Sequence, residues 1–370
     1  MNSKILELCY HYLALSLAII VLNPKMNELN HSITKQRATR IMLFTSIVIL
    51  FDIASGVFLS DGYAGTSSFM GPFRIILSIF SPAIAILILI TYIVAAGKTL
   101  SVTHKCWAAS LISTYCIYRC YSGSKQPIAF LILAFIIAKL VCCGPIIMKT
   151  KHLVMSTLLI PLVGLNFFLG NIMRFYQRGY IETNNLIERI SAIKTSFGNI
   201  FRAVSSRMGF FDYYVESSEN SLYPPYISFK YYFKSITDKL SPGFDVFGVP
   251  YASRMFTYAR NGSLPKTGMN SDQVTLFGET SVIFSFFSII MFFLMILFFK
   301  FLLKRRPEKD PFLNLLYAAI IFRAYWGWLY GFGFDMFICI DVIYNLIFFF
   351  CMAWFCRMRL CRQQNLLIKQ

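Results

Sequence analysis

The chain has 370 residues, of which 57% are apolar and only 14% are charged. A soluble domain with a water-facing exterior does not support that balance, so the composition predicts an integral membrane protein. The formal net charge is +18, and on so hydrophobic a chain this excess indicates membrane topology and anionic lipid and excludes nucleic-acid binding.

Nine hydrophobic segments are long enough to be membrane-spanning helices. A helix rises about 1.5 Å per residue, so crossing roughly 30 Å of hydrocarbon takes about 20 residues. The first segment lacks the cleavage pattern of a signal peptide and is expected to be retained. The fourth is the weakest, because it is short and ends in polar residues around Arg119. The segments are 5–22, 41–59, 73–96, 107–121, 127–147, 153–173, 282–300, 312–330 and 334–356.

Lysine and arginine orient these spans, because both are retained on the cytoplasmic side during insertion. One set of alternate connections carries 17 of them, whereas the short connections of the opposite set, 1–4, 60–72, 122–126 and 331–333, carry only Lys4 and Lys125. We therefore expect the N-terminus outside and the C-terminus inside, and the rule also supports counting the fourth span. The basic, inward set is 23–40, 97–106, 148–152, 300–311 and 357–370.

The expected fold is an all-α, polytopic membrane helix bundle of about nine spans with one large, partly helical extracytoplasmic loop. Six spans form an N-terminal bundle over 1–173, and three more lie within 282–356. Between them stands the loop, 174–281, and a basic cytoplasmic tail follows at 357–370.

The 174–281 segment concentrates the polar chemistry of the chain. Its 108 residues hold 9 of the 17 acidic residues, 12 of the 35 basic ones and 10 of the 21 tyrosines. Apolar residues recur at helical spacing over 186–204 and again over 226–240, after the breaker pair Pro224-Pro225. Both stretches read as amphipathic helices on the outer membrane surface. A connection this long is usually functional, so we expect the site here.

Arginines of this segment are candidate phosphate ligands, because the planar guanidinium donates two parallel charge-assisted hydrogen bonds. A lipid diphosphate at the membrane surface is the expected ligand. Each arginine can equally pair with a carboxylate or a lipid headgroup. The candidates are Arg174, Arg178, Arg207, Arg254 and Arg260.

Carboxylates of the same segment are candidate bases, provided that burial raises the pKa toward neutrality. Each can equally be a solvated loop charge. The four histidines all lie outside the segment, which disfavours a histidine base there. The carboxylate candidates are Asp212, Glu216, Glu219, Asp245, Asp272 and Glu279.

Tyrosines such as Tyr213 and Tyr251 could form a platform for sugar rings, or equally an interfacial aromatic belt. Charged residues within the predicted spans are rarer and costlier. Asp52 and Arg323 are expected to face a bundle interior, whereas Lys139 is close enough to the cytoplasmic end to reach it. Asp335 and Asp341 lie near the outer end of the last span.

Several motifs are absent from the sequence. It has no Walker loop, no Gly-x-Gly-x-x-Gly, no His-Glu-x-x-His and no Gly-x-Ser-x-Gly. It also lacks a paired Asp-x-Asp that could hold a metal for nucleotide-sugar chemistry, so a lipid-linked donor fits better. None of the ten cysteines lies in the longest polar region, which disfavours a disulfide-stapled ectodomain and a cysteine zinc module.

The layout of many spans around one dominant extracytoplasmic loop resembles the O-antigen and capsular polysaccharide repeat-unit polymerases of bacterial inner membranes. Members often have a Pro-Arg pair midway through the loop, where this chain has Pro250-Tyr251 and its nearest arginine at Arg254. The resemblance covers mainly 174–300. It rests on Ser206-Arg207 with Asp212-Tyr213, Ser241-Pro242-Gly243 with Pro250-Tyr251-Ala252, Lys266-Thr267-Gly268-Met269-Asn270, and Phe277-Gly278-Glu279.

The resemblance implies a metal-independent type C glycosyltransferase without cofactors in the bacterial inner membrane. The donor would be a growing glycan on undecaprenyl diphosphate and the acceptor a single lipid-linked repeat unit. A chain-length regulator and a flippase would be partners. Diphosphate and substrate binding would fall to Arg178, Arg207, Arg254, Arg260, Tyr213 and Tyr251, and the base would be Asp212 or Glu279.

Two other classes of protein stay open. A flippase or transporter of lipid-linked oligosaccharide would need a charged passage through the spans, which Asp52, Lys139 and Arg323 could supply. A non-catalytic accessory protein of polysaccharide assembly would tolerate the loss of any single charge in 174–281.

Overall fold

A computed structural model describes residues 35–55, 79–121, 127–143, 164–166, 168–170, 229–240, 246–249, 288–305, 310–329 and 337–355. Every regular element within these ranges is a helix, and no strand occurs in them. The predicted all-α class is therefore confirmed for the part of the chain that the structure describes.

Contacts divide the chain into two compact units. The bundle unit consists of Met26–Ile200, Glu308–Ile320 and Asn345–Gln370. The α12 unit, named after its short helix, consists of Met1–Lys25, Phe201–Pro307 and Ile321–Tyr344. Two long helices therefore contribute one part to each unit.

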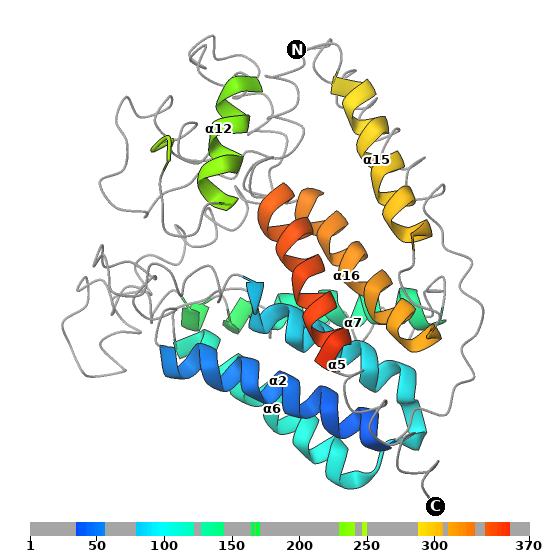
Figure 1. The fold of residues 1–370 in the computed structure, drawn as a ribbon. Coiled ribbons are helices and arrows are strands. Elements are labelled where there is room, and N and C mark those ends of the chain that lie inside the picture. Colours follow the sequence, from blue (N-terminus) through cyan, green and yellow to red (C-terminus); the bar gives the residue numbers. More distant parts are fainter. Residues whose placement is uncertain are drawn as a thin grey trace, which may run out of the picture. The chain divides into compact units, whose positions relative to one another are not determined.

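Four helices build the bundle unit: α2 (Lys35–Ser55), α5 (Pro82–Ala96), α6 (Val102–Tyr121) and α7 (Pro127–Cys143) (Figure 1). Helix α5 contacts both α2 and α7, and α6 contacts α2 and α7 as well. Nearly every side chain of α5 is buried. An apolar helix without a polar face requires a central position, because it has no side to offer water.

Aromatic rings fill the core of the bundle unit. The ring of Phe44 on α2 lies 5.3 Å from that of Phe348 and 6.5 Å from that of Phe80, measured between centroids. The edge of Tyr92 on α5 meets Phe312 at 5.8 Å, in the T-shaped arrangement that aromatic quadrupoles favour. Phe44, Phe312 and Phe348 are all buried.

Prolines set where three helices begin, since α5, α7 and α16 (Pro311–Leu329) each start with one. Proline suits the first helical position because the missing N–H would be unsatisfied there anyway. The predicted span 73–96 is therefore wrong in its continuity: the chain is extended at Ser81 (φ −62°, ψ 122°) and the helix begins at Pro82. The residue before a proline is driven out of the helical region by a steric clash.

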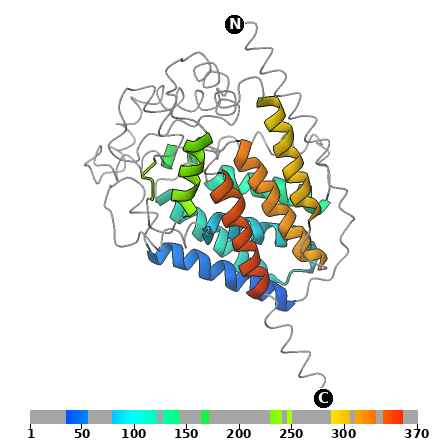
Figure 2. The same cartoon turned by 45° about the horizontal axis from the view of Figure 1, so that its top comes forward.

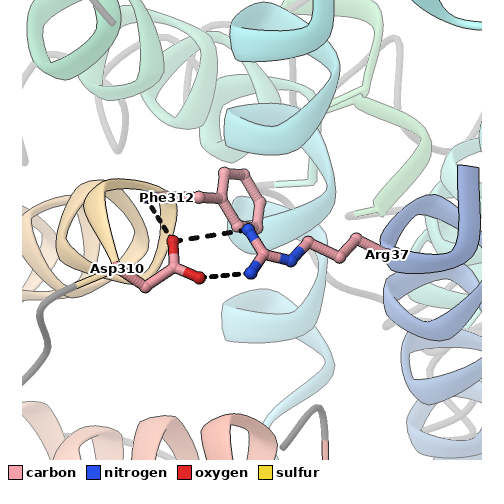
Figure 3. A network of polar contacts seen from close by, with 3 residues as sticks. All are labelled: Arg37, Asp310 and Phe312. Atoms are coloured by element: carbon pink, nitrogen blue, oxygen red, sulfur yellow. Dashed lines mark hydrogen bonds and ion pairs between the residues drawn. The ribbon is translucent and has the colours of Figure 1, made fainter. Parts of the chain in front are cut away.

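Asp310 caps α16 and ties it to α2 (Figure 3). One carboxylate oxygen accepts a hydrogen bond of 2.9 Å from the Phe312 N–H, as a helix N-cap does. The two oxygens also face the guanidinium of Arg37 as a bidentate ion pair, whose longer contact measures 3.4 Å. The predicted inward connection 300–311 thus ends in a residue that orders two helices of the bundle unit.

The α12 unit holds α12 (Phe229–Leu240), α15 (Ser288–Lys304), the second part of α16 and the π-helix η3 (Phe337–Tyr344). The Phe299 ring lies 5.2 Å from Tyr325 and 5.6 Å from Phe337, so one aromatic cluster joins α15, α16 and η3. Helix α15 runs to Lys304, four residues past the predicted end of the 282–300 span. Three further apolar residues, Phe301 to Leu303, follow Lys300, so the hydrophobic stretch extends past that lysine.

Among the described residues, one helix, Phe337–Phe355, is long and apolar enough to cross a membrane, and three shorter apolar helices cover Pro82–Ala96, Pro127–Cys143 and Phe312–Tyr325. Helix α15 also exposes several large apolar side chains, a surface that suits contact with lipid. These features support association with a membrane. The nine-span bundle stays a prediction, and the first predicted span, 5–22, lies outside the described residues.

Candidate functional site

The site residues predicted from the sequence all lie outside the described ranges. They are Arg178, Arg207, Asp212, Tyr213, Tyr251, Arg254, Arg260 and Glu279. The structure therefore neither brings them together nor separates them. The amphipathic stretch 186–204 also lies outside the described residues, whereas its counterpart at 226–240 lies largely within them.

Helix α12 confirms the second amphipathic helix predicted in the 174–281 segment. Its start at Phe229 lies four residues after Pro225, as expected after a helix breaker. One face is buried and carries Tyr231, Tyr232 and Ser235. The Tyr231 and Tyr232 rings meet edge to face at 5.4 Å. The buried face is thus aromatic and polar rather than aliphatic.

This buried face rests on η3, the first half of the last helix (Figure 2). The Tyr344 hydroxyl donates a hydrogen bond of 2.6 Å to the backbone carbonyl of Lys239, one of the orphan acceptors at the end of α12. Nearer the start of η3, the Sγ atom of Cys339 lies 3.9 Å from the backbone carbonyl oxygen of Ile236 in the last turn of α12. Side chains of η3 therefore cap the C-terminus of α12.

The same π-helix carries Asp341, which forms an ion pair with Arg323 of α16 at 3.9 Å between Oδ1 and Nη1. The side chains are 20% and 23% exposed, so the pair is partly open. A π-helix turns its side chains differently from an α-helix, and such segments are frequent at functional sites. Sequence analysis identified both charges as intramembrane but placed the site elsewhere.

Gly327 makes room for this pair. A Cβ added at Gly327 would lie 2.6 Å from Arg323 Nη1 and 2.7 Å from Asp341 Cγ, closer than real atoms approach. Glycine is thus the residue that lets α16 and the carboxylate of η3 come together at this point. Gly327 therefore receives charged side chains rather than a helix backbone.

A second, more deeply buried ion pair lies in the bundle unit. Asp52 Oδ2 of α2 is 3.6 Å from Arg119 Nη2 of α6, and their side chains are 6% and 8% exposed. The Arg119 guanidinium also lies 5.6 Å from the centre of the Tyr115 ring. The prediction that Asp52 faces a bundle interior is confirmed, and its partner is a residue that sequence analysis treated only as a mark of weak hydrophobicity.

His104, the histidine within the described ranges, makes contacts that stabilise helix packing. His104 Nδ1 lies 2.6 Å from Ser101 Oγ and its Nε2 lies 3.1 Å from Thr39 Oγ1, so it links the start of α6 to α2. Lys139 lies over the Phe135 ring at 5.7 Å. Within the described ranges, no group of three His, Cys, Asp or Glu side chains could hold a metal ion.

Among the described residues, the Arg323–Asp341 pair is the best candidate for binding a ligand. A guanidinium that is partly exposed can present part of its donor fork to an anion. The adjoining carboxylate can balance its charge or accept a proton when no anion is bound. Asp52 and Arg119 are enclosed by comparison and suit a structural role. Searches against models of known protein families, curated proteins and solved structures find no match to this chain.

Proposed function

We propose that the chain polymerises oligosaccharide repeat units carried on undecaprenyl diphosphate into O-antigen or capsular polysaccharide at the periplasmic face of the inner membrane. In this reaction the acceptor's sugar hydroxyl attacks the anomeric carbon of the donor, and undecaprenyl diphosphate leaves. The hydroxyl proton passes to a carboxylate, for which Asp212 and Glu279 are the candidates.

One observation carries the proposal: helix α12, from the polar 174–281 segment, contacts η3, and η3 carries Asp341, the ion-pair partner of Arg323 on α16. A polymerase of this class needs its large loop to meet the membrane where the lipid carrier's diphosphate lies. The contact between α12 and η3 supports that arrangement, because it attaches part of the loop to the helix whose Asp341 pairs with a guanidinium suited to phosphate.

The predicted topology supports the same assignment. Arg323 lies seven residues before the end of the 312–330 span, and Asp341 lies seven residues after the start of the 334–356 span. Both positions then lie about 10 Å inside the outer boundary of the hydrocarbon, at a rise of 1.5 Å per residue. Arg323 would join Arg207, Arg254 and Arg260 in stabilising the departing diphosphate in a partly dry site.

A gene deletion with complementation tests the proposal. Loss of a polymerase leaves glycans of a single repeat unit on a gel of cell-surface polysaccharide, whereas loss of a flippase leaves none. We expect the deletion to leave one unit and the intact chain to restore long polymers. Arg323→Ala should fail to restore them, and Arg323→Lys should restore them partly because it keeps the charge without the planar fork.

Arg37→Ala is the matched control. It also removes an arginine from an ion pair of similar exposure, 30% and 22% for Arg37 and Asp310, but in the bundle unit. It should restore long polymers at normal protein levels on an immunoblot. Long polymers from an Arg323→Ala chain present at the same level would contradict the role of Arg323, and an empty lane from the deletion would contradict polymerisation itself.

The buried Asp52–Arg119 pair favours a second candidate, a flippase or transporter of lipid-linked oligosaccharide. Ionisable residues inside apolar helices often mark a substrate path. In that case variants at Asp52 and Arg119 would abolish every glycan at the cell surface, including the single repeat unit. Sensitivity confined to Arg323, Asp341 and the 174–281 segment would favour the polymerase.

A further inference from the structure

Helix α12 turns large apolar side chains away from its buried face. Phe233 is 64% exposed, and Leu240 lies exposed two turns further along the same side. The turn that follows adds Val246 and Phe247, both exposed. In water such a group of apolar side chains is costly, so its presence on a helix of a polar segment indicates a partner.

Lysines border these apolar side chains. Lys230 is exposed one turn before Phe233. The ammonium of Lys234 lies 5.5 Å from the centre of the Phe247 ring, a cation–π contact that joins helix and turn. The one acidic residue of α12, Asp238, is buried. Among the described residues around these apolar side chains, the charged groups that reach the surface are therefore lysines.

Asp238 also fixes the shape of this surface. Its Oδ1 accepts a hydrogen bond of 2.7 Å from the Phe247 N–H, and its Oδ2 accepts one of 2.9 Å from the Val249 N–H. Gly248, between them, has a φ of +61°, which glycine adopts without strain. The turn is thus clipped to α12, and Phe247 is held in place beside Lys234 before any partner arrives.

We propose that this surface, here called the α12 outer face, binds the headgroup region of an anionic bilayer. It consists of Lys230, Phe233, Lys234, Leu240, Val246 and Phe247. Aromatic and aliphatic side chains enter the boundary between headgroups and acyl chains, while lysines extend to anionic phosphates. An uncharged apolar partner would bury the two ammonium groups without a counter-charge. The inference holds whether or not the chain transfers sugars.

Tryptophan quenching in nanodiscs tests the proposal on the full chain. Phe233→Trp places the probe in the α12 outer face, and its signal is taken relative to the parent chain, which has four tryptophans. We expect lipids brominated near the headgroup to quench it more than lipids brominated near the chain end. Quenching should be stronger in phosphatidylglycerol mixtures than in pure phosphatidylcholine.

Removing the lysines should reduce this dependence on lipid charge. Each lysine near an anionic surface favours the docked helix about fivefold, from roughly 1 kcal/mol per charge. The double variant Lys230→Ser/Lys234→Ser in the Phe233→Trp background should therefore lose most of the difference between the two lipid compositions. Phe293→Trp on α15, also exposed, is the matched control and should be quenched equally in both.

Three outcomes would overturn the proposal. The first is absence of quenching by either brominated lipid, both for Phe233→Trp and for a second probe, Phe247→Trp. The second is quenching that is equal in the anionic and neutral discs. The third is a probe environment that changes only when two copies of the chain share a disc, since this would assign the α12 outer face to self-association.

Discussion

Both units place an aspartate and an arginine together among apolar helices, but they enclose them to different degrees. Asp52 and Arg119 are at most 8% exposed, whereas Arg323 and Asp341 are at least 20% exposed. The first pair joins two neighbouring helices of one bundle. The second joins α16 to η3, the π-helix that contacts α12. A fully buried ion pair has no access to a ligand, whereas a partly exposed pair can exchange its partner for one. We therefore assign a structural role to Asp52–Arg119 and a ligand-binding role to Arg323–Asp341.

The largest expected effect tests the structural assignment. Arg119→Ala should destabilise the chain by about 3–5 kcal/mol, because it leaves the Asp52 carboxylate buried without a counter-charge. Thermal unfolding of the detergent-solubilised chain, followed by size-exclusion chromatography, measures the loss. The double variant Asp52→Leu/Arg119→Met should recover most of it, since apolar residues of similar size need no counter-charge. A single variant as stable as the parent would place this pair in contact with water.

The next effect separates activity from stability at the partly exposed Arg323–Asp341 pair. Gly327→Ala puts a methyl group into the space occupied by Arg323 Nη1 and the Asp341 carboxylate. We expect a stability loss of about 1–3 kcal/mol, the usual cost of overpacking, together with a loss of long polysaccharide in complemented cells. Gly164→Ala is the control, because a Cβ there meets nothing within 4 Å. If a stably produced Gly327→Ala chain still made long polymers, the proposed role of the Arg323–Asp341 pair in polymerisation would be contradicted.

Within the described residues, hydrophobic periodicity and breakers predicted the all-α class and the second amphipathic helix of the polar segment, α12, but not the break at Ser81 within 73–96. Side-chain pairing was predicted less well, because one sequence does not show which helices are neighbours. Asp52 was expected to face an interior, but nothing in the sequence links it to Arg119, 67 residues away. Arg323 and Asp341 were recognised as costly charges, yet their joint position depends on Gly327 and on a π-helix that no local pattern predicts.

The smallest effect concerns the contact between α12 and η3, the helix that carries Asp341. Tyr344→Phe removes the hydrogen bond to the Lys239 carbonyl and nothing else of the side chain. Its loss should weaken the docking of α12 by about 1 kcal/mol, the usual net value of one hydrogen bond. Hydrogen exchange followed by mass spectrometry should then show about fivefold faster exchange over Phe229–Leu240 and unchanged exchange in α2.

Tyr118→Phe supplies the matched control from the bundle unit. Its hydroxyl reaches the Asp52 carbonyl at 3.4 Å, a longer and weaker contact, and it lies on α6. The same chemical change there should leave exchange in α12 as it is in the parent. If Tyr344→Phe also leaves it unchanged, the other contacts of α12, including its buried tyrosines and the Cys339 thiol, are sufficient to hold the helix on η3.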